Sequence, residues 1–253
     1  MSHFIAPYFI TPHWPAPRNV KALQTTRLGG GSLPPYDALN LGEHVGDSPQ
    51  RVAQNRALLA QYLPNSPLWL SQVHGTRVLD ANLSQSSQRS QRSQQADASF
   101  TQQRHQVCCV MTADCLPLLF CNEAGTQVAA AHAGWRGLLN GILENTLASF
   151  NDGPESIFVW LGPAIGPAHF EVGQEVYAAF CGQQPAAKVA FTEGSQQGKW
   201  LADLYVLARL RLQRCGITNI YGGELCTFSD EARFFSYRRD GVCGRQASCI
   251  WLE

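Results

Sequence analysis

The chain has 253 residues, of which 45% are hydrophobic and 15% charged, so it can bury a large globular core. Lys and Arg together number 19, as do Asp and Glu, and no charge excess would drive binding to nucleic acid or to an anionic membrane. The nine cysteines include no CxxC pair and lack the dense spacing of a disulfide-rich secreted domain, so most are expected to be reduced, buried side chains.

The N-terminal residues 1–22 are predicted to be extended, because several prolines interrupt them. The same prolines break the apolar run that a signal peptide requires, and no later segment approaches the length of a membrane-spanning helix. We therefore expect a soluble, cytoplasmic protein. Glycines 29–31 form either a flexible turn or a backbone segment that a ligand can approach closely. Residues 49–63 carry apolar side chains at helical spacing and are predicted to form a scaffold helix.

The middle of the chain is predicted to be rich in strands. Short apolar runs at 68–70 and 77–79 place His74 at or just beyond the end of a strand. Residues 82–95 are polar and low in complexity, so they are predicted to form a flexible, exposed loop. Three further runs have strand length and are predicted to be central strands covered on both faces: 107–111, 117–121 and 127–131.

The C-terminal half alternates helices with strands. Helices are predicted from Gly137, at 173–181 and at 201–215, and strands at 157–161 and 248–252. The order lacks a strict βαβ rhythm, which favours an α+β (mixed α/β) fold with mixed β-sheets flanked by helices in layers. We expect one domain over residues 1–253.

Three side chains of metal-ligand type lie at predicted strand-to-loop junctions: His74, Cys115 and His132. Two imidazoles and one thiolate are the ligand set of a catalytic zinc site that keeps a fourth position open. Their spacing matches no compact zinc-finger pattern, and each could instead be a core residue. In a metal-free alternative, His132 deprotonates Cys115 as a nucleophile, and Asp114 or His74 orients the imidazole.

Other groups near these junctions could hold an anion. The helix predicted from Gly137 would direct its first N–H groups toward the same pocket. Four arginines lie in predicted loops beside glycine: Arg27, Arg136, Arg238 and Arg239. They are candidate phosphate ligands only if they cluster at the pocket. Cys226, Cys243 and His169 are expected to be core or surface residues.

Seven segments carry a resemblance to a known family: TTRLGGGS, PYDALNLGEHVGD, SQVHGTRV, MTADCLPLLF, AHAGWRGLLNGIL, GPAIGPAHFEVG and FFSYRRDGVCGRQAS. Together, over about residues 20–252, they resemble the YfiH family. That family is also called the laccase-domain or multicopper polyphenol oxidase family, the purine nucleoside phosphorylase family and peptidoglycan editing factor. The resemblance implies a YfiH-like mixed α/β fold of cysteine-hydrolase type.

The resemblance also implies a catalytic zinc site. Its ligands would be His74 in QVHG, Cys115 in TADC and His132 in HAGWRG. The matching motifs point in addition to Arg27 and Asn40 as residues of the substrate pocket. We expect Arg136 and Arg238 to contribute to substrate binding as well.

The leading functional prediction is zinc-dependent phosphorolysis of purine nucleosides (adenosine, inosine, guanosine and methylthioadenosine), accompanied by adenosine deamination. Phosphorolysis requires an oxyanion site, which Arg27, Arg136 and the helix start could provide. Deamination uses a metal-activated water and an acidic proton shuttle, for which Glu171, Glu175 and Asp114 are candidates. The expected partners are purine nucleosides and phosphate, bound by a monomer or weak homodimer.

Three alternatives stay open. The first is an amidase that edits UDP-muramyl-peptide precursors of peptidoglycan, with Cys115 as nucleophile or with a metal-activated water. The second, a copper-dependent polyphenol oxidase, is disfavoured: a four-copper enzyme needs about ten histidines, usually in His-x-His pairs, whereas the chain has seven histidines and no such pair. A single copper ion could still occupy the zinc site. The third alternative is a non-catalytic metal-binding module.

Overall fold

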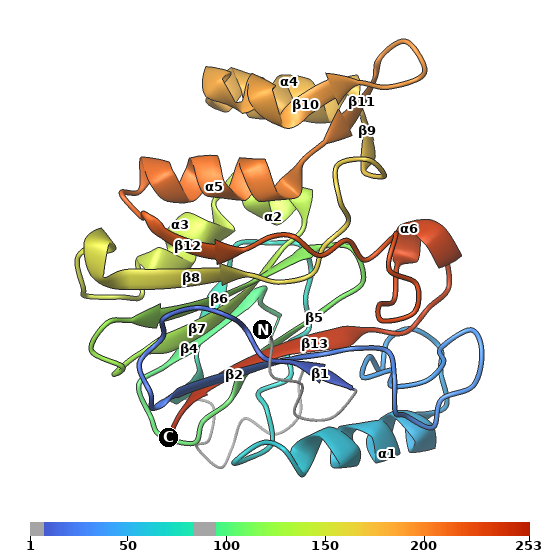
Figure 1. The fold of residues 1–253 in the computed structure, drawn as a ribbon, viewed down its shortest axis with the longest axis vertical. Coiled ribbons are helices and arrows are strands. Elements are labelled where there is room, and N and C mark those ends of the chain that lie inside the picture. The colour runs from blue at the N-terminus through green and yellow to red at the C-terminus, as the bar shows by residue number, and fades with distance from the viewer. Residues whose placement is uncertain (1–7, 83–94) are drawn as a thin grey trace.

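A computed structural model describes residues 8–82 and 95–253 of the chain. These residues form stacked layers of helices, sheet, sheet and helix, which Figure 1 shows from top to bottom beneath a smaller projecting unit. A separate buried cluster fills each interface between successive layers. The predicted mixed α+β fold with layered sheets is confirmed.

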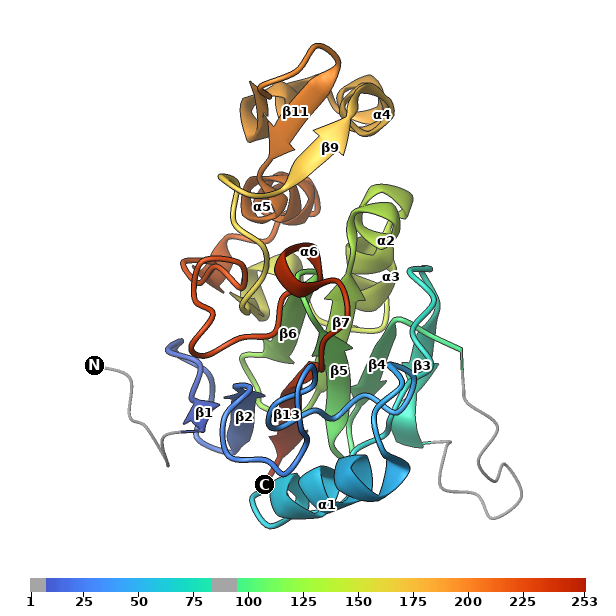
Figure 2. The same ribbon diagram turned by 90° about the vertical axis from the view of Figure 1, so that its right-hand side faces the viewer.

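Helices cover the outer face of each of the two larger sheets. Their bounds are α1 Pro49–Ala60, α2 Trp135–Asn140, α3 Ile142–Leu147, α4 Gln174–Gln183, α5 Leu204–Arg214 and α6 Tyr237–Asp240, with short 3-10 helices at Pro154–Ser156 and Pro185–Ala190. Helices α2, α3 and α5 lie on one side, and α1 lies alone on the other, as the turned view in Figure 2 also shows.

The strands form three sheets. Their bounds are β1 Phe9–Ile10, β2 Val20–Thr25, β3 Val78–Asp80, β4 Ala98–Thr101, β5 Cys108–Thr112, β6 Leu116–Asn122, β7 Val128–Ala133, β8 Ile157–Leu161, β9 Glu171–Gly173, β10 Phe191–Glu193, β11 Lys199–Ala202, β12 Asn219–Gly222 and β13 Gln246–Leu252. The six-stranded sheet has the order β12-β8-β6-β7-β4-β3, the four-stranded sheet β1-β2-β13-β5, and the small sheet β10-β11-β9.

Strand β6 shows why the central runs contain almost no polar residues. Successive side chains of a strand point to opposite faces. Leu118 and Phe120 pack toward the helices, whereas Leu119 and Cys121 pack against the four-stranded sheet. All seven residues of β6 are buried. The prediction of central strands covered on both faces is confirmed for this strand.

The cysteines are used mainly for packing. All nine are free thiols, and five of them are buried: Cys108, Cys109, Cys121, Cys243 and Cys249. Burial raises the pKa of Cys108 and Cys121 to about 12, which keeps these thiols neutral. The expectation of reduced, buried cysteines is therefore confirmed for most of them.

Several predicted element boundaries are wrong. The helix predicted from Gly137 begins at Trp135, and Gly141, with φ of 102°, divides it into α2 and α3. The helix predicted over 201–215 begins only at Leu204, because the side chain of Asp203 caps it and the residues before Asp203 pair in β11. The strand predicted at 68–70 is reduced to a single bridge.

A smaller unit made of β9, α4, β10 and β11 projects beyond α5 (Figure 1). The loop predicted at 82–95 falls almost entirely outside the residues that the structure describes. Among those it does describe, no helix combines the length and apolar character needed to cross a membrane.

We predict that Leu118→Ala lowers the free energy of unfolding by about 2–5 kcal/mol, because Leu118 is fully buried between the central strands and the helices. Guanidinium denaturation followed by circular dichroism measures the change. Leu33→Ala serves as the matched control, since Leu33 is 54% exposed and its loss should cost no more than about 0.5 kcal/mol. Equal losses for the two variants would contradict this description of the core.

Candidate metal centre

Neighbouring strands of the six-stranded sheet bring the predicted ligands to one edge. Cys115 directly precedes β6, and His132 lies near the end of β7, which runs antiparallel to β6. The start of one antiparallel strand lies beside the end of its partner. Strand β4 is also antiparallel to β7, and β3 is parallel to β4, so the residues just before β4 and β3 reach the same edge. Those residues include Asp97 and the turn that carries His74.

A buried carboxylate organises this edge. Asp97 is fully buried and accepts hydrogen bonds from the backbone N–H groups of Val73 (3.2 Å), His74 (2.9 Å) and Gly75 (2.7 Å). Its Oδ1 also lies 2.8 Å from Nδ1 of His132. Sequence reasoning assigned no role to Asp97. The available signal was a lone acidic residue between alanines at the start of a buried strand.

Both ligand-bearing turns have unusual backbone conformations. His74 has φ of 59° and Asp114 has φ of 92°, a region that residues other than glycine seldom adopt. Such conformations persist where neighbouring groups hold them. Beside the first turn, the side-chain amide of Gln72 forms two hydrogen bonds with the backbone of Met111, at 2.7 and 2.8 Å. The fold itself therefore sets the geometry of the ligand turns.

The structure brings His74, Cys115 and His132 together, with their ligand atoms within 4.8 Å of one another. Nε2 of His74 lies 3.7 Å from Sγ of Cys115. Zinc bonds of about 2.3 Å to sulfur and about 2.0–2.1 Å to nitrogen, at a tetrahedral angle, would separate these two atoms by about 3.5 Å. The spacing of His74 and Cys115 therefore fits zinc, and the three side chains together could hold a metal ion. His132 is buried and His74 exposed, so the site opens to solvent on the His74 side.

The charges within the cluster favour a thiolate. Burial favours the neutral thiol of Cys115, but the imidazoles of His132 and His74 outweigh it and lower the pKa of Cys115 from 9.0 to about 6. Burial likewise opposes protonation of His132, yet Cys115 and Asp97 raise the pKa of His132 to about 9. Without a metal, this pairing favours the thiolate of Cys115 beside a protonated His132.

Asp114 does not orient an imidazole, which corrects one of our predictions. Its carboxylate accepts a hydrogen bond of 2.6 Å from the hydroxyl of Thr227 and another of 2.6 Å from the backbone N–H of Arg238. Asp97 is the carboxylate that contacts His132. Asp114 instead ties the turn before Cys115 to the segment that contains α6.

Gly134 allows α2 to begin against the ligands. A Cβ at Gly134 would lie 2.7 Å from Cδ2 of His74 and 3.0 Å from Sγ of Cys115, so a larger residue would displace the ligands. Helix α2 starts at the next residue. Arg136, in its first turn, is exposed, and its guanidinium lies 4.3 Å from the ring centroid of Trp135.

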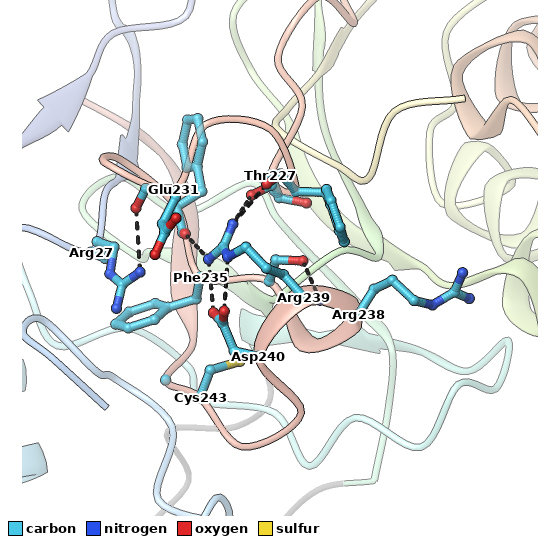
Figure 3. Close-up of polar contacts among 12 residues, drawn as sticks. Arg27, Thr227, Glu231, Phe235, Arg238, Arg239, Asp240 and Cys243 are labelled. Atoms are coloured by element: carbon cyan, nitrogen blue, oxygen red, sulfur yellow. Dashed lines mark hydrogen bonds and ion pairs between the residues drawn. The ribbon is translucent and has the colours of Figure 1, made fainter. Parts of the chain in front are cut away.

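Arg27 and Arg238 occupy different parts of the molecule. Figure 3 shows the side chain of Arg238 pointing away from Arg27, with Phe235 between them. The guanidinium of Arg238 donates to the backbone carbonyls of His169 and Glu171, at 3.2 and 3.1 Å. That of Arg27 lies over the Phe235 ring and bonds Asp37, in a pocket of about 340 Å³.

Two other predicted residues have internal partners. Asn40 is fully buried, its Nδ2 donates to Gly42 and Asp47, and its Oδ1 accepts from Gly42 and Arg245. A substrate contact through Asn40 would require this network to open. Arg239 donates to the backbone carbonyls of the 227–234 segment and pairs with Asp240 (Figure 3), so it holds that segment in place.

The remaining candidates lie around the α6 segment. His169 stacks on Phe228, with ring centroids 4.2 Å apart, and Cys243 is buried. Cys226 is half-buried at a surface pocket of about 780 Å³. Burial opposes ionisation of Cys226, but hydrogen bonds from Ser229 lower its pKa.

Two acidic residues proposed as proton shuttles lie in the projecting unit. Glu171 lies in β9, and Glu175 is exposed in the first turn of α4.

The fold and the cluster define a mixed α+β protein with a candidate metal centre, and comparisons with known proteins agree. Residues 21–253 match the family model described as multi-copper polyphenol oxidoreductase laccase. A relative from Escherichia coli (strain K12), named purine nucleoside phosphorylase YfiH, is 54% identical over 96% of this chain and 98% of its own. A Haemophilus influenzae relative, named purine nucleoside phosphorylase, is 50% identical over 96% of this chain and 99% of its own.

A crystal structure of a Neisseria meningitidis protein superposes with a TM-score of 0.91 at 52% identity, covering 97% of this chain and 99% of that one. The chain belongs to the YfiH family, whose model carries the multi-copper laccase description. The family resemblance read from the sequence motifs is thereby confirmed.

We predict that Cys115 in metal-free protein is alkylated by iodoacetamide with a half-maximal rate near pH 6. The reason is that only the thiolate reacts, and the thiolate of Cys115 forms above its pKa of about 6. Peptide mapping by mass spectrometry separates Cys115 from Cys226, and zinc should protect Cys115. A rate that instead rises around pH 9 would show an ordinary thiol and contradict the pairing with the two histidines.

Proposed function

We propose that this protein is a zinc-dependent purine nucleoside phosphorylase that acts on adenosine, inosine, guanosine and methylthioadenosine. The observation that carries the proposal is the open cluster of His74, Cys115 and His132 in a chain about half identical to relatives named purine nucleoside phosphorylase. Two imidazoles, a thiolate and an open position are typical of a catalytic zinc site.

The donor set favours zinc over the copper chemistry of the family description. Among the described residues, the three ligands form the only cluster of its kind, and the whole chain has seven histidines. A set of four coppers would need several such clusters. A copper ion could still bind the same three side chains, because copper(II) often binds nitrogen and sulfur donors more tightly than zinc does.

Phosphorolysis forms a bond between a phosphate oxygen and C1′ of the ribose while the bond from C1′ to the purine nitrogen breaks, and the purine leaves with the electron pair. When bound, zinc would supply a Lewis acid that polarises a substrate oxygen. The residues of the chain would bind phosphate, orient the nucleoside and exclude water. These tasks require cationic groups fixed close to the ligands.

We propose that Arg136 and Arg238 hold the phosphate. Arg136 follows Gly134, which packs against Cys115 and His74. The backbone of Arg238 is bonded to Asp114, the residue before Cys115. Guanidinium groups bind phosphate oxygens through paired, charge-assisted hydrogen bonds. Arg27 is less favoured, because its guanidinium pairs with the carboxylate of Asp37, whereas that of Arg238 donates to the backbone carbonyls of His169 and Glu171.

We predict that zinc-loaded protein converts inosine and phosphate to hypoxanthine and ribose 1-phosphate, and that Cys115→Ala lowers the rate by more than about 100-fold. This loss of rate should exceed the loss from replacing a residue that only hydrogen-bonds a ligand, because Cys115 is itself a predicted metal ligand. Coupled detection of hypoxanthine gives the rate, and metal analysis should show about one zinc per wild-type chain. Cys181→Ala is the control, since Cys181 lies in α4 and is not one of the three ligands.

The same assay separates the alternatives. Inosine formed from adenosine without phosphate would reveal the accompanying deaminase activity, which stays a prediction. Zinc-loaded protein that releases no ribose 1-phosphate but cleaves the amide of a UDP-muramyl peptide would overturn the phosphorylase proposal in favour of the amidase. Wild-type protein that binds no metal would contradict the zinc-dependent phosphorylase and would leave, of these two enzymes, only an amidase with Cys115 as nucleophile.

A further inference from the structure

Asp97 is a buried carboxylate, and one of its oxygens, Oδ1, contacts both histidines of the candidate centre. Oδ1 lies 2.9 Å from the backbone nitrogen of His74 and 2.8 Å from Nδ1 of His132. Oδ2 accepts the backbone N–H groups of Val73 and Gly75, at 3.2 and 2.7 Å. The side chain of Asp97 is 0% exposed. Four donors therefore converge on one carboxylate that no solvent reaches.

This contact selects the tautomer of His132. An ionised carboxylate only accepts hydrogen bonds, so Nδ1 of His132 must carry the proton that it donates to Asp97. In the neutral ring, the second nitrogen, Nε2, then has a free lone pair. Nε2 is then the nitrogen of His132 that can bind a metal beside Cys115 and His74.

The turn that carries His74 depends on the same carboxylate. Three consecutive backbone N–H groups, from Val73 to Gly75, point toward Asp97. The left-handed φ of 59° at His74 is unfavourable for this residue and needs such support. Without the acceptor, three part-buried backbone donors would lose their partner.

The charge of Asp97 is paired with one of the predicted metal ligands. Over residues 8–82 and 95–253, its only ion pair is with His132, and it forms none with a lysine or arginine. Buried carboxylates are normally paired with a cation or with metal-bound groups. The contact with His132 thus joins the buried carboxylate directly to the metal-ligand cluster.

We propose that Asp97 is the positioning residue of the metal centre: one carboxylate fixes the metal-binding tautomer of His132 and folds the turn that presents His74. The inference rests on the proposed function only in that the centre binds zinc, and it concerns the assembly of the site rather than the reaction.

Asparagine at this position cannot reproduce the contacts. If its NH₂ group replaces Oδ1, it faces Nδ1 of His132 as a donor, and His132 must then carry its proton on Nε2, where a metal would bind. If the NH₂ group replaces Oδ2, it opposes the N–H groups of Val73 and Gly75. Either orientation of the amide therefore disturbs one ligand, through the tautomer of His132 or through the turn that carries His74.

The test compares zinc affinity in Asp97→Asn and Asp203→Asn, measured by competition with a chromophoric chelator. Asp203 is a matched control, because its carboxylate also accepts two backbone N–H groups, those of Tyr205 and Val206, but at the start of α5. We expect Asp97→Asn to bind zinc about 10- to 100-fold more weakly than wild type, and Asp203→Asn to bind it normally. Unchanged affinity in Asp97→Asn, or an equal loss in both variants, would overturn the inference.

A measurement on the wild-type chain covers the case in which Asp97→Asn fails to fold. In zinc-loaded protein labelled with ¹⁵N, the imidazole signals of His132 should show a proton on Nδ1 and none on Nε2. A proton on Nε2, or none on Nδ1, would contradict the role of Asp97. If wild-type protein binds no zinc at all, the proposed metal centre fails; if it binds zinc with the opposite tautomer, only the role of Asp97 fails.

Discussion

The register of four neighbouring strands is the constraint on which the site depends. In the order β6, β7, β4 and β3, each strand places one functional group at the same edge of the sheet: Cys115, His132, Asp97 and the turn of His74. A shift of one residue in any of these pairings would turn its group to the opposite face. The buried packing on both faces of the sheet therefore fixes the chemistry at its edge.

This arrangement also explains where polar groups occur. The interior of the six-stranded sheet is covered by helices on one face and by the second sheet on the other, and an uncompensated charge there would be costly. Charged and ligating side chains instead gather where strands end. The left-handed residues at 74 and 114 let the chain turn tightly at that edge, and Gly134 leaves space beside the ligands, so that groups from distant segments meet.

The sequence predicted much of this organisation. Runs of apolar residues located the central strands, and the motifs around His74, Cys115 and His132 identified the cluster that the structure brings together. Element ends were less predictable: Gly141 divides a helix that looked continuous, and pairing in β11 replaces the start of another. Pairing with β10 and β9 decided the second of these positions, and local sequence patterns do not record such long-range contacts. Asp97 and the Asp114 network were missed for the same reason, because their partners lie far away in sequence.

The central claim is that one zinc ion is held by two imidazoles and one thiolate, with a position left open. X-ray absorption spectroscopy at the zinc edge of the zinc-loaded protein tests it most directly. The account predicts one sulfur neighbour at about 2.3 Å and two or three nitrogen or oxygen neighbours at about 2.0–2.1 Å. A first shell without sulfur, or with several sulfur atoms, would contradict it.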